Sequence, residues 1–145
     1  MFYSLRMAER KDLEVMKQFV GKAGISTEGF EQIIDQFVLL ESDEQNIVGC
    51  LGMELIGQDG LLRSLVISDQ LNQAHLAALL KSIDALKERK KVRSVYLMTN
   101  KQTSIEFLEI LGFRQINVDQ LPEHLSNCQH VKQTLQSDHA TFMVK

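Results

Sequence analysis

The chain has few cysteines, a single proline and no long apolar stretch, and these scarcities exclude several classes of protein. Cys50 and Cys128 cannot form the disulfide framework of a small secreted domain, which indicates a reducing, cytosolic setting. No apolar run approaches the ~20 residues that a membrane-spanning helix requires. Residues 1–6 also lack the apolar core of a signal peptide. We therefore expect a cytoplasmic protein that does not enter the membrane.

Charge of one sign is also scarce, because the formal net charge of the 145 residues is only −3. Such a weak field does not draw a protein to nucleic acid or to an acidic membrane. The basic run at 87–93 falls at the end of a predicted helix, where cations complement the helix dipole. With 44% apolar and 24% charged residues, the composition is that of a globular protein. The length predicts one domain over residues 1–145.

Apolar spacing and turn residues predict an α/β protein in which strands alternate with helices. The predicted strands cover 2–7, 38–41, 47–56, 61–67, 92–98, 113–118 and 140–144. One helix follows Asp12, and another, capped by Ser26 or Thr27, presents Phe30, Ile33, Ile34 and Phe37 on one face. A long helix is expected over 73–90, a shorter one starts near Thr103, and a short helix or irregular segment covers 121–125. Glycines inside strand 47–56 indicate a bulge or a close backbone approach.

The order of elements between Gly60 and Phe113 is the most informative feature of the sequence. An apolar strand, a long amphipathic helix, a second strand and a short helix ending in Leu-Gly-Phe resemble the acyl-CoA-binding half of the GNAT acetyltransferases. Residues 47–54 (IVGCLGME), 62–67 (LRSLVI) and 107–114 (FLEILGFR) carry the likeness, which extends over almost the whole chain. The tail at 121–125 and 143–145 looks closest to small amino-acid acetyltransferases associated with arsenic resistance. The resemblance implies a single-domain GNAT fold, with a mostly antiparallel sheet whose fourth and fifth strands splay apart.

The resemblance also implies acetyl-CoA as co-substrate. In that family the pantetheine arm pairs with the fourth strand, which is represented here by Leu65, Val66 and Ile67. The pyrophosphate lies at the start of the following helix, where free N–H groups and the helix dipole favour an anion. That segment comprises Leu71, Asn72, Gln73, Ala74, His75 and Leu76. Asn100 and Phe107 complete the cofactor-binding residues that the family implies.

This helix start departs from the family pattern, which is rich in glycine and carries an arginine. Leu71 stands at the arginine position, and Asn72, Ala74 and Leu76 stand at the glycine positions. Helix N–H donors do not depend on glycine, so phosphate binding remains open, although side chains now crowd it. If the loop still presents N–H groups, an enzyme is favoured. If Asn72 or Leu76 fills that space, a non-catalytic binding module is favoured.

Acetyl transfer to an amine also requires groups that move protons. Glu54 is the candidate general base, and Arg63 is a candidate for binding a substrate carboxylate. Glu54 alternatively faces solvent, and Arg63 alternatively forms a structural ion pair with Glu54 across the hairpin. The family's tyrosine acid is replaced by Leu108.

Three further features have a plain structural explanation beside a functional one. His75 could touch a phosphate or lie at the surface. His124, Cys128 and His130 lie close in sequence, but no fourth ligand has suitable spacing, so we expect no metal. Cys50 is expected to be a small buried residue rather than a nucleophile, because no histidine partner is evident.

The sequence thus predicts an acetyl-CoA-dependent N-acetyltransferase acting on the amine of a small molecule, with an amino-acid-like acceptor as one option. The alternative is a GNAT-fold binding module that has lost tight acetyl-CoA binding. Neither hypothesis involves nucleic acid or a membrane, and a homodimer formed through terminal strands is a further expectation from the family.

Overall fold

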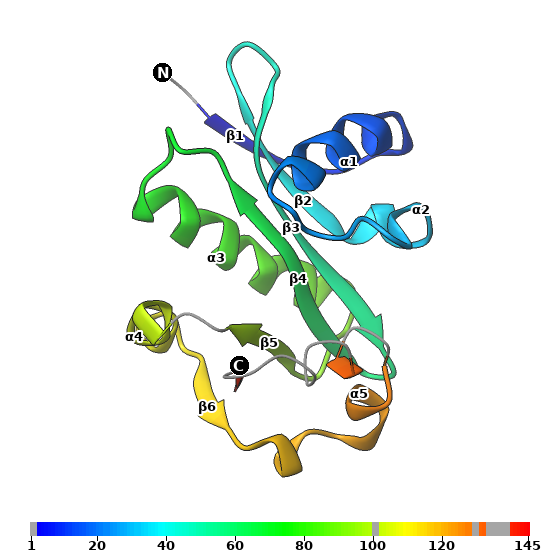
Figure 1. Ribbon diagram of the computed structural model, residues 1–145, viewed down its shortest axis with the longest axis vertical. Coiled ribbons are helices and arrows are strands. Elements are labelled where there is room, and N and C mark those ends of the chain that lie inside the picture. Colours follow the sequence, from blue (N-terminus) through cyan, green and yellow to red (C-terminus); the bar gives the residue numbers. More distant parts are fainter. Residues whose placement is uncertain (1–2, 100–101, 129–130, 133–139) are drawn as a thin grey trace. The chain divides into compact units, whose positions relative to one another are not determined.

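The structure is a computed structural model that describes residues 3–99, 102–128, 131–132 and 140–145. It is an α/β protein whose sheet has the strand order β1-β2-β3-β4-β5-β7-β6 (Figure 1). The chain divides into two compact units, of which the first comprises residues 1–54 and 63–86. The second comprises residues 55–62 and 87–145. The prediction of one domain over 1–145 stays a prediction.

The elements confirm the predicted alternation of strands and helices. The strands are β1 (Tyr3–Met7), β2 (Phe37–Ser42), β3 (Ile47–Ile56), β4 (Asp59–Ile67), β5 (Val95–Thr99), β6 (Arg114–Ile116) and β7 (Thr141–Val144). The α-helices are α1 (Leu13–Lys22), α2 (Phe30–Ile33), α3 (Gln73–Arg89), α4 (Gln102–Ile110) and α5 (Glu123–Ser126). Among the described residues, no helix is both long and apolar enough to cross a bilayer.

The first unit is built on the antiparallel strands β1, β2 and β3. Strand β2 is buried over most of its length, because α1 and α2 lie on one side of it and α3 lies on the other (Figure 1). The core on the α1 side contains Ala8, Met16, Val20, Phe30, Ile34, Phe37, Leu39 and Cys50. Met16 and Val20 of α1 are buried in this core, as the apolar spacing of the helix predicted.

Phe37 corrects one prediction, because it begins β2 instead of continuing a helical face. Helix α2 ends at Ile33, and a short 3-10 turn leads into the strand. Its N-cap is Gly29 in the left-handed conformation (φ 83°), in place of the predicted Ser26 or Thr27. The Phe37 ring lies 4.7 Å from that of Phe30. A Cβ on Gly52 would stand 2.7 Å from the Phe37 ring, so a side chain, and not the backbone approach that the sequence predicted, lies close to this interior glycine.

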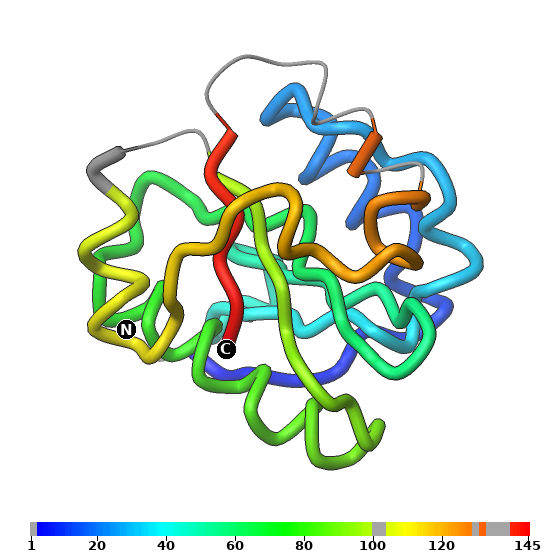
Figure 2. The backbone as a smooth tube through the Cα atoms, turned by 90° about the horizontal axis from the view of Figure 1, so that it is seen from below, coloured from blue at the N-terminus to red at the C-terminus, as the bar shows by residue number. Residues whose placement is uncertain are grey.

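The second unit contains the start of β4 together with β5, β7 and β6. Strands β4 and β5 are parallel and pair Gly60 with Val95 and Leu61 with Tyr96. This short ladder at the start of both strands is the pairing expected where two strands splay. Strand β7, red in Figure 2, runs antiparallel to both β5 and β6. The core of this unit contains Leu61, Leu121, Leu125, Val131 and Phe142.

Candidate functional site

At the end of the segment between β4 and α3, the side chain of Asn72 accepts hydrogen bonds from the first backbone N–H groups of the helix. Its Oδ1 accepts hydrogen bonds from the backbone N–H groups of Ala74 (3.0 Å) and His75 (3.3 Å). Its carbonyl oxygen accepts from the N–H groups of His75 (3.1 Å) and Leu76 (3.2 Å). Asn72 is therefore an N-cap, a position at which asparagine is strongly preferred. The sequence analysis treated Asn72 as a side chain that crowds the phosphate position, and it did not predict the role of Asn72 as an N-cap.

His75 completes the cap from the other direction. Its Nδ1 accepts a hydrogen bond from the Asn72 N–H at 3.1 Å, as a glutamate does in a capping box. The His75 ring also contacts the Tyr3 ring edge-on, with 4.7 Å between ring centroids. The imidazole is thus engaged within the first unit.

Two backbone N–H groups at the start of α3 consequently converge on one oxygen atom. This is the geometry by which a helix N-terminus binds an anion, and here an amide oxygen of the chain occupies it. Asn72, Gln73 and Ala74 are exposed, so solvent reaches this point. Leu76 is half-buried, and its N–H remains within the helix.

The three β4 residues implied in pantetheine binding differ in their surroundings. Leu65 is 38% exposed. Val66 is half-buried and packs against the core of the first unit. Ile67 lies beside Gly49, where a Cβ would stand 3.6 Å from its Cγ2.

Glu54 and Arg63 form the ion pair that one of the two sequence interpretations predicted. Arg63 Nη1 donates to Glu54 Oε1 at 2.7 Å, and the two side chains are only 11% and 25% exposed. The guanidinium also lies over the Phe30 ring, 5.9 Å from its centroid. Arg63 Nε is buried and has no hydrogen-bond partner. Glu54 is therefore not a free base in this state, because its carboxylate is engaged by a cation.

Ser64, the next residue of β4, has an unusual backbone conformation. Its φ of 58° places a non-glycine residue in the left-handed region within a strand, as occurs at β-bulges. The residue is buried, and its Oγ has no hydrogen-bond partner. No feature of the sequence marks a serine for this conformation, and sequence analysis did not select it.

Cys50 donates its thiol to the carbonyl oxygen of Ser64 at 3.3 Å. Burial raises the pKa of this thiol to about 12, so it carries no thiolate near neutral pH. Cys50 is thus the small buried residue that the sequence predicted.

The remaining cofactor residues belong to the second unit or lie outside the described residues. Phe107 is half-buried in α4, and Asn100 falls outside the described residues. Leu108, at the position of the family's tyrosine, is buried. Burial also raises the pKa of Tyr96, a half-buried residue that packs against the core of the second unit.

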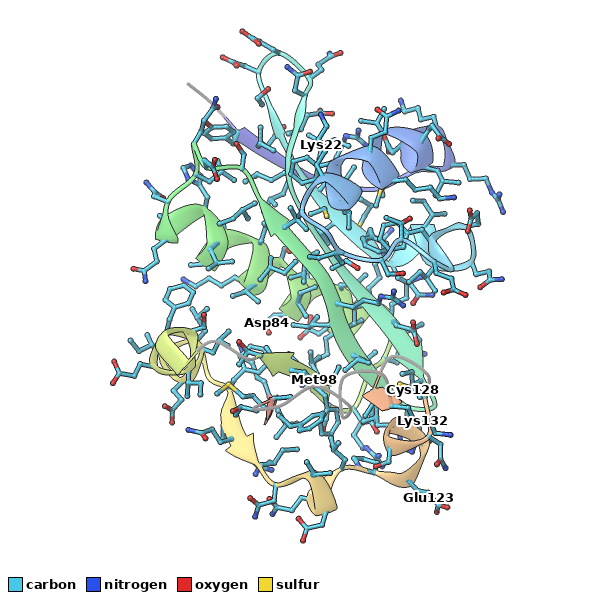
Figure 3. The ribbon with its side chains drawn as sticks, viewed as in Figure 1. Lys22, Asp84, Met98, Glu123, Cys128 and Lys132 are labelled. Carbon is cyan, nitrogen blue, oxygen red and sulfur yellow. The ribbon has the colours of Figure 1, made fainter. Side chains whose placement is uncertain are left out.

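The second unit contains an ionic cluster of its own around the fully buried carboxylate of Asp59. Asp59 accepts from Arg93 Nε (3.3 Å) and Nη2 (3.0 Å), and His124 Nε2 lies 2.7 Å from its Oδ2. His124 is thus engaged by a carboxylate. Cys128, labelled in Figure 3, follows α5, and His130 lies outside the described residues. Within the described part of the chain, no three side chains are grouped to hold a metal ion.

Comparison with known proteins provides a sequence relative and several structural ones, whereas no family model matches the sequence. The uncharacterized protein YwlB from Bacillus subtilis is 42% identical over 146 residues, covering 100% of this chain and 98% of YwlB. The chain belongs to the YwlB family.

The structural relatives identify the fold. N-acetylglutamate synthase from Neisseria gonorrhoeae, complexed with coenzyme A and N-acetyl-glutamate, matches with a TM-score of 0.79 and 21% identity. The match covers 100% of this chain but only 35% of the synthase chain. Rv2747 from Mycobacterium tuberculosis, solved with CoA, has a TM-score of 0.76 and 17% identity, with 97% of each chain covered. A GNAT-family acetyltransferase from Staphylococcus aureus Mu50 has a TM-score of 0.76 and 18% identity, covering 99% of this chain and 98% of its own. This protein therefore has the GNAT fold, as predicted.

Proposed function

We propose that this protein is a cytoplasmic N-acetyltransferase that transfers an acetyl group from acetyl-CoA to the amine of a small, amino-acid-like molecule. The observation that carries the proposal is the GNAT fold shared with structures solved with coenzyme A. The Asn72 Oδ1 occupies the space at the start of α3, where it accepts from the Ala74 and His75 N–H groups, so the enzyme requires this side chain to move. The backbone there has the form that binds a phosphate oxygen. Structural relatives with the same fold hold coenzyme A, which supports the same cofactor here.

Cofactor binding then requires the Asn72 side chain to rotate away, so that a pyrophosphate oxygen takes the place of its Oδ1. Asn72 is exposed, and such a rotation moves no core residue. The backbone groups of β4 at Leu65, Val66 and Ile67 are the proposed contacts of the pantetheine arm. Helix α3 supplies its dipole to the phosphates without the glycines or the arginine of the usual pattern.

In the chemical step, the neutral amine nitrogen attacks the thioester carbonyl carbon. The carbon–sulfur bond breaks, and CoA leaves as a thiolate that takes a proton from solvent. Glu54 is the proposed base that receives the proton of the amine, once its contact with Arg63 loosens. Leu108 cannot supply the proton of the leaving group, so water takes the role of the family's tyrosine.

A non-catalytic GNAT-fold binding module is the second candidate. It is favoured by the Asn72 cap, because the chain itself satisfies the N–H groups that a pyrophosphate would use. In this case the fold is retained, and the protein binds a different ligand or acts through a partner. A homodimer stays a prediction under either function.

Titration calorimetry with acetyl-CoA, and with desulfo-CoA as a second ligand, tests the proposal. Micromolar binding of both ligands is expected, and a screen of acceptor amines for CoA release then follows. Absence of binding at millimolar cofactor would exclude the acetyltransferase and leave the binding module.

A further inference from the structure

Two buried side-chain atoms without a hydrogen-bond partner stand out in the described part of the chain, and they belong to consecutive residues of β4. They are Arg63 Nε and Ser64 Oγ. Unpaired buried polar atoms are few in native proteins, and each one destabilises the fold. The left-handed backbone of Ser64 adds strain at the same point. A ligand oxygen that accepted a hydrogen bond from either atom would remove part of this penalty.

Arg6, in the same unit, shows what a structural arginine looks like in this protein. Its Nε and Nη2 donate to Glu41, and its Nη1 and Nη2 donate to Asp12. The Arg6 side chain is 31% exposed, whereas that of Arg63 is only 11% exposed. The more buried guanidinium thus has fewer partners, which is the reverse of what burial alone requires.

The unpaired Nε of Arg63 lies on one particular edge of the guanidinium. Glu54 contacts Nη1 of Arg63, and the edge formed by Nε and Nη2 is the one that fits a carboxylate side-on. In Arg6 that edge donates to Glu41, and in Arg93 of the second unit it donates to Asp59. Arg6 further shows that one guanidinium in this protein holds two carboxylates at once.

We propose that Arg63 and Ser64 form a carboxylate-binding site that selects an acceptor carrying both an amine and a carboxylate. Arg63 Nε can only donate a hydrogen bond, and the Ser64 hydroxyl can donate one, so the ligand atoms are oxygen acceptors. Arg63 supplies the charge, and Ser64 supplies a second donor. The proposal rests on the proposed function, since it specifies the acceptor of that reaction.

The first experiment measures binding of the twenty L-amino acids by saturation-transfer NMR, with desulfo-CoA present. Each amino acid that binds is then compared by titration with its α-amide, which removes the carboxylate charge and leaves the amine. The acid is expected to bind about tenfold to a hundredfold more tightly than the amide, as a charge-assisted hydrogen-bonded pair predicts. Equal affinity of acid and amide, or no amino-acid binding at millimolar concentration, would overturn the proposal.

Variants then assign the effect to these residues. R63K keeps the charge but loses the side-on edge, and S64A loses the hydroxyl, so each is expected to weaken binding of the acid about tenfold while leaving that of the amide unchanged. S64G removes the hydroxyl and also relieves the backbone strain, so it should bind weakly although it unfolds at a higher temperature. R6K is the matched control and should bind as the wild type does.

If S64A and S64G bind the acid as tightly as the wild type, Ser64 is not part of the site. If R63K does so, Arg63 is not part of the site. Thermal unfolding of each variant shows whether it folds, and if R63K does not, the serine variants and the comparison of acid with amide decide. Release of CoA from acetyl-CoA is followed separately with a thiol reagent. Carboxylate-selective binding without CoA release would support this inference and contradict the proposed acetyltransferase.

Discussion

Replacing Asn72 separates the stability of α3 from cofactor binding, because the same side chain affects the two in opposite directions. In N72A the cap is lost, which is expected to destabilise the fold by about 1 kcal/mol. The same change frees the N–H group of Ala74 and leaves that of His75 with only the Asn72 carbonyl oxygen as its acceptor. A pyrophosphate would no longer displace two hydrogen bonds worth about 0.5–1.5 kcal/mol each. The affinity for acetyl-CoA should therefore rise by about tenfold to a hundredfold.

N72D provides the opposite test. An aspartate accepts the same two N–H groups, caps the helix at least as well, and places a negative charge at the phosphate position. The N72D variant should therefore unfold at the wild-type temperature or above it, and it should bind acetyl-CoA at least about tenfold more weakly. Titration calorimetry measures the affinities, and thermal denaturation followed by circular dichroism measures the stabilities.

S-acetyl-pantetheine, which lacks the pyrophosphate, is the ligand control. Its affinity should be the same in the wild type, N72A and N72D, since it places no phosphate at α3. The reasoning is refuted if N72A binds acetyl-CoA no more tightly than the wild type. It is also refuted if acetyl-pantetheine responds to the variants as acetyl-CoA does.

Two further predictions concern stability in the first unit. The Arg6 guanidinium holds the pKa of Asp12 below its usual range through a hydrogen-bonded ion pair. A carboxyl whose folded pKa is lowered stabilises the protein above its unfolded pKa of about 3.9, and that stability is lost as the pH falls through the folded pKa. Urea denaturation should therefore show a steeper loss of stability below about pH 4 in the wild type than in D12N. G52A should lower the free energy of unfolding by about 1–3 kcal/mol, because the new methyl group would meet the Phe37 ring. The control G21A, in helix α1 with nothing within 4 Å of the new Cβ, should stabilise the protein slightly, and equal effects of the two changes would contradict this packing argument.

The sequence predicted most elements because local spacing and burial point to the same answer in them. Strand β3 has the predicted bounds of 47–56, and α3 ends one residue before the predicted 90. Both are long, with a clear apolar pattern and a polar or glycine-containing boundary. Phe37 was misassigned because its apolar spacing continued that of Phe30 and Ile34, although the structure uses it to begin a strand. A periodic pattern does not show where one element gives way to the next.

The candidate site was predicted less completely, for reasons that differ between residues. One of the two interpretations of the sequence predicted the ion pair of Glu54 and Arg63, because the predicted hairpin brings these residues together. The Asn72 cap could also have been predicted from the sequence, since asparagine is a preferred N-cap residue directly before a helix. The contact of Asp59 with His124 joins residues separated by 65 positions, and no local pattern reports it. The backbone of Ser64 likewise depends on its tertiary surroundings.

The two candidate functions differ in what they require of the first unit. A pure binding module does not use the N–H groups at the start of α3 to bind a phosphate. In that case the hydrogen bonds that Asn72 accepts from them only cap the helix. An acetyltransferase must reopen them, yet Arg63 and Ser64 already offer unpaired donors in the same unit. If N72A tightens acetyl-CoA binding and an amino acid still binds through its carboxylate, both halves of a transferase are present and Asn72 sets only the cofactor affinity. If the amino acid binds while neither N72A nor the wild type binds acetyl-CoA, the fold has kept only the carboxylate site, and the protein is a binding module for a small amino acid.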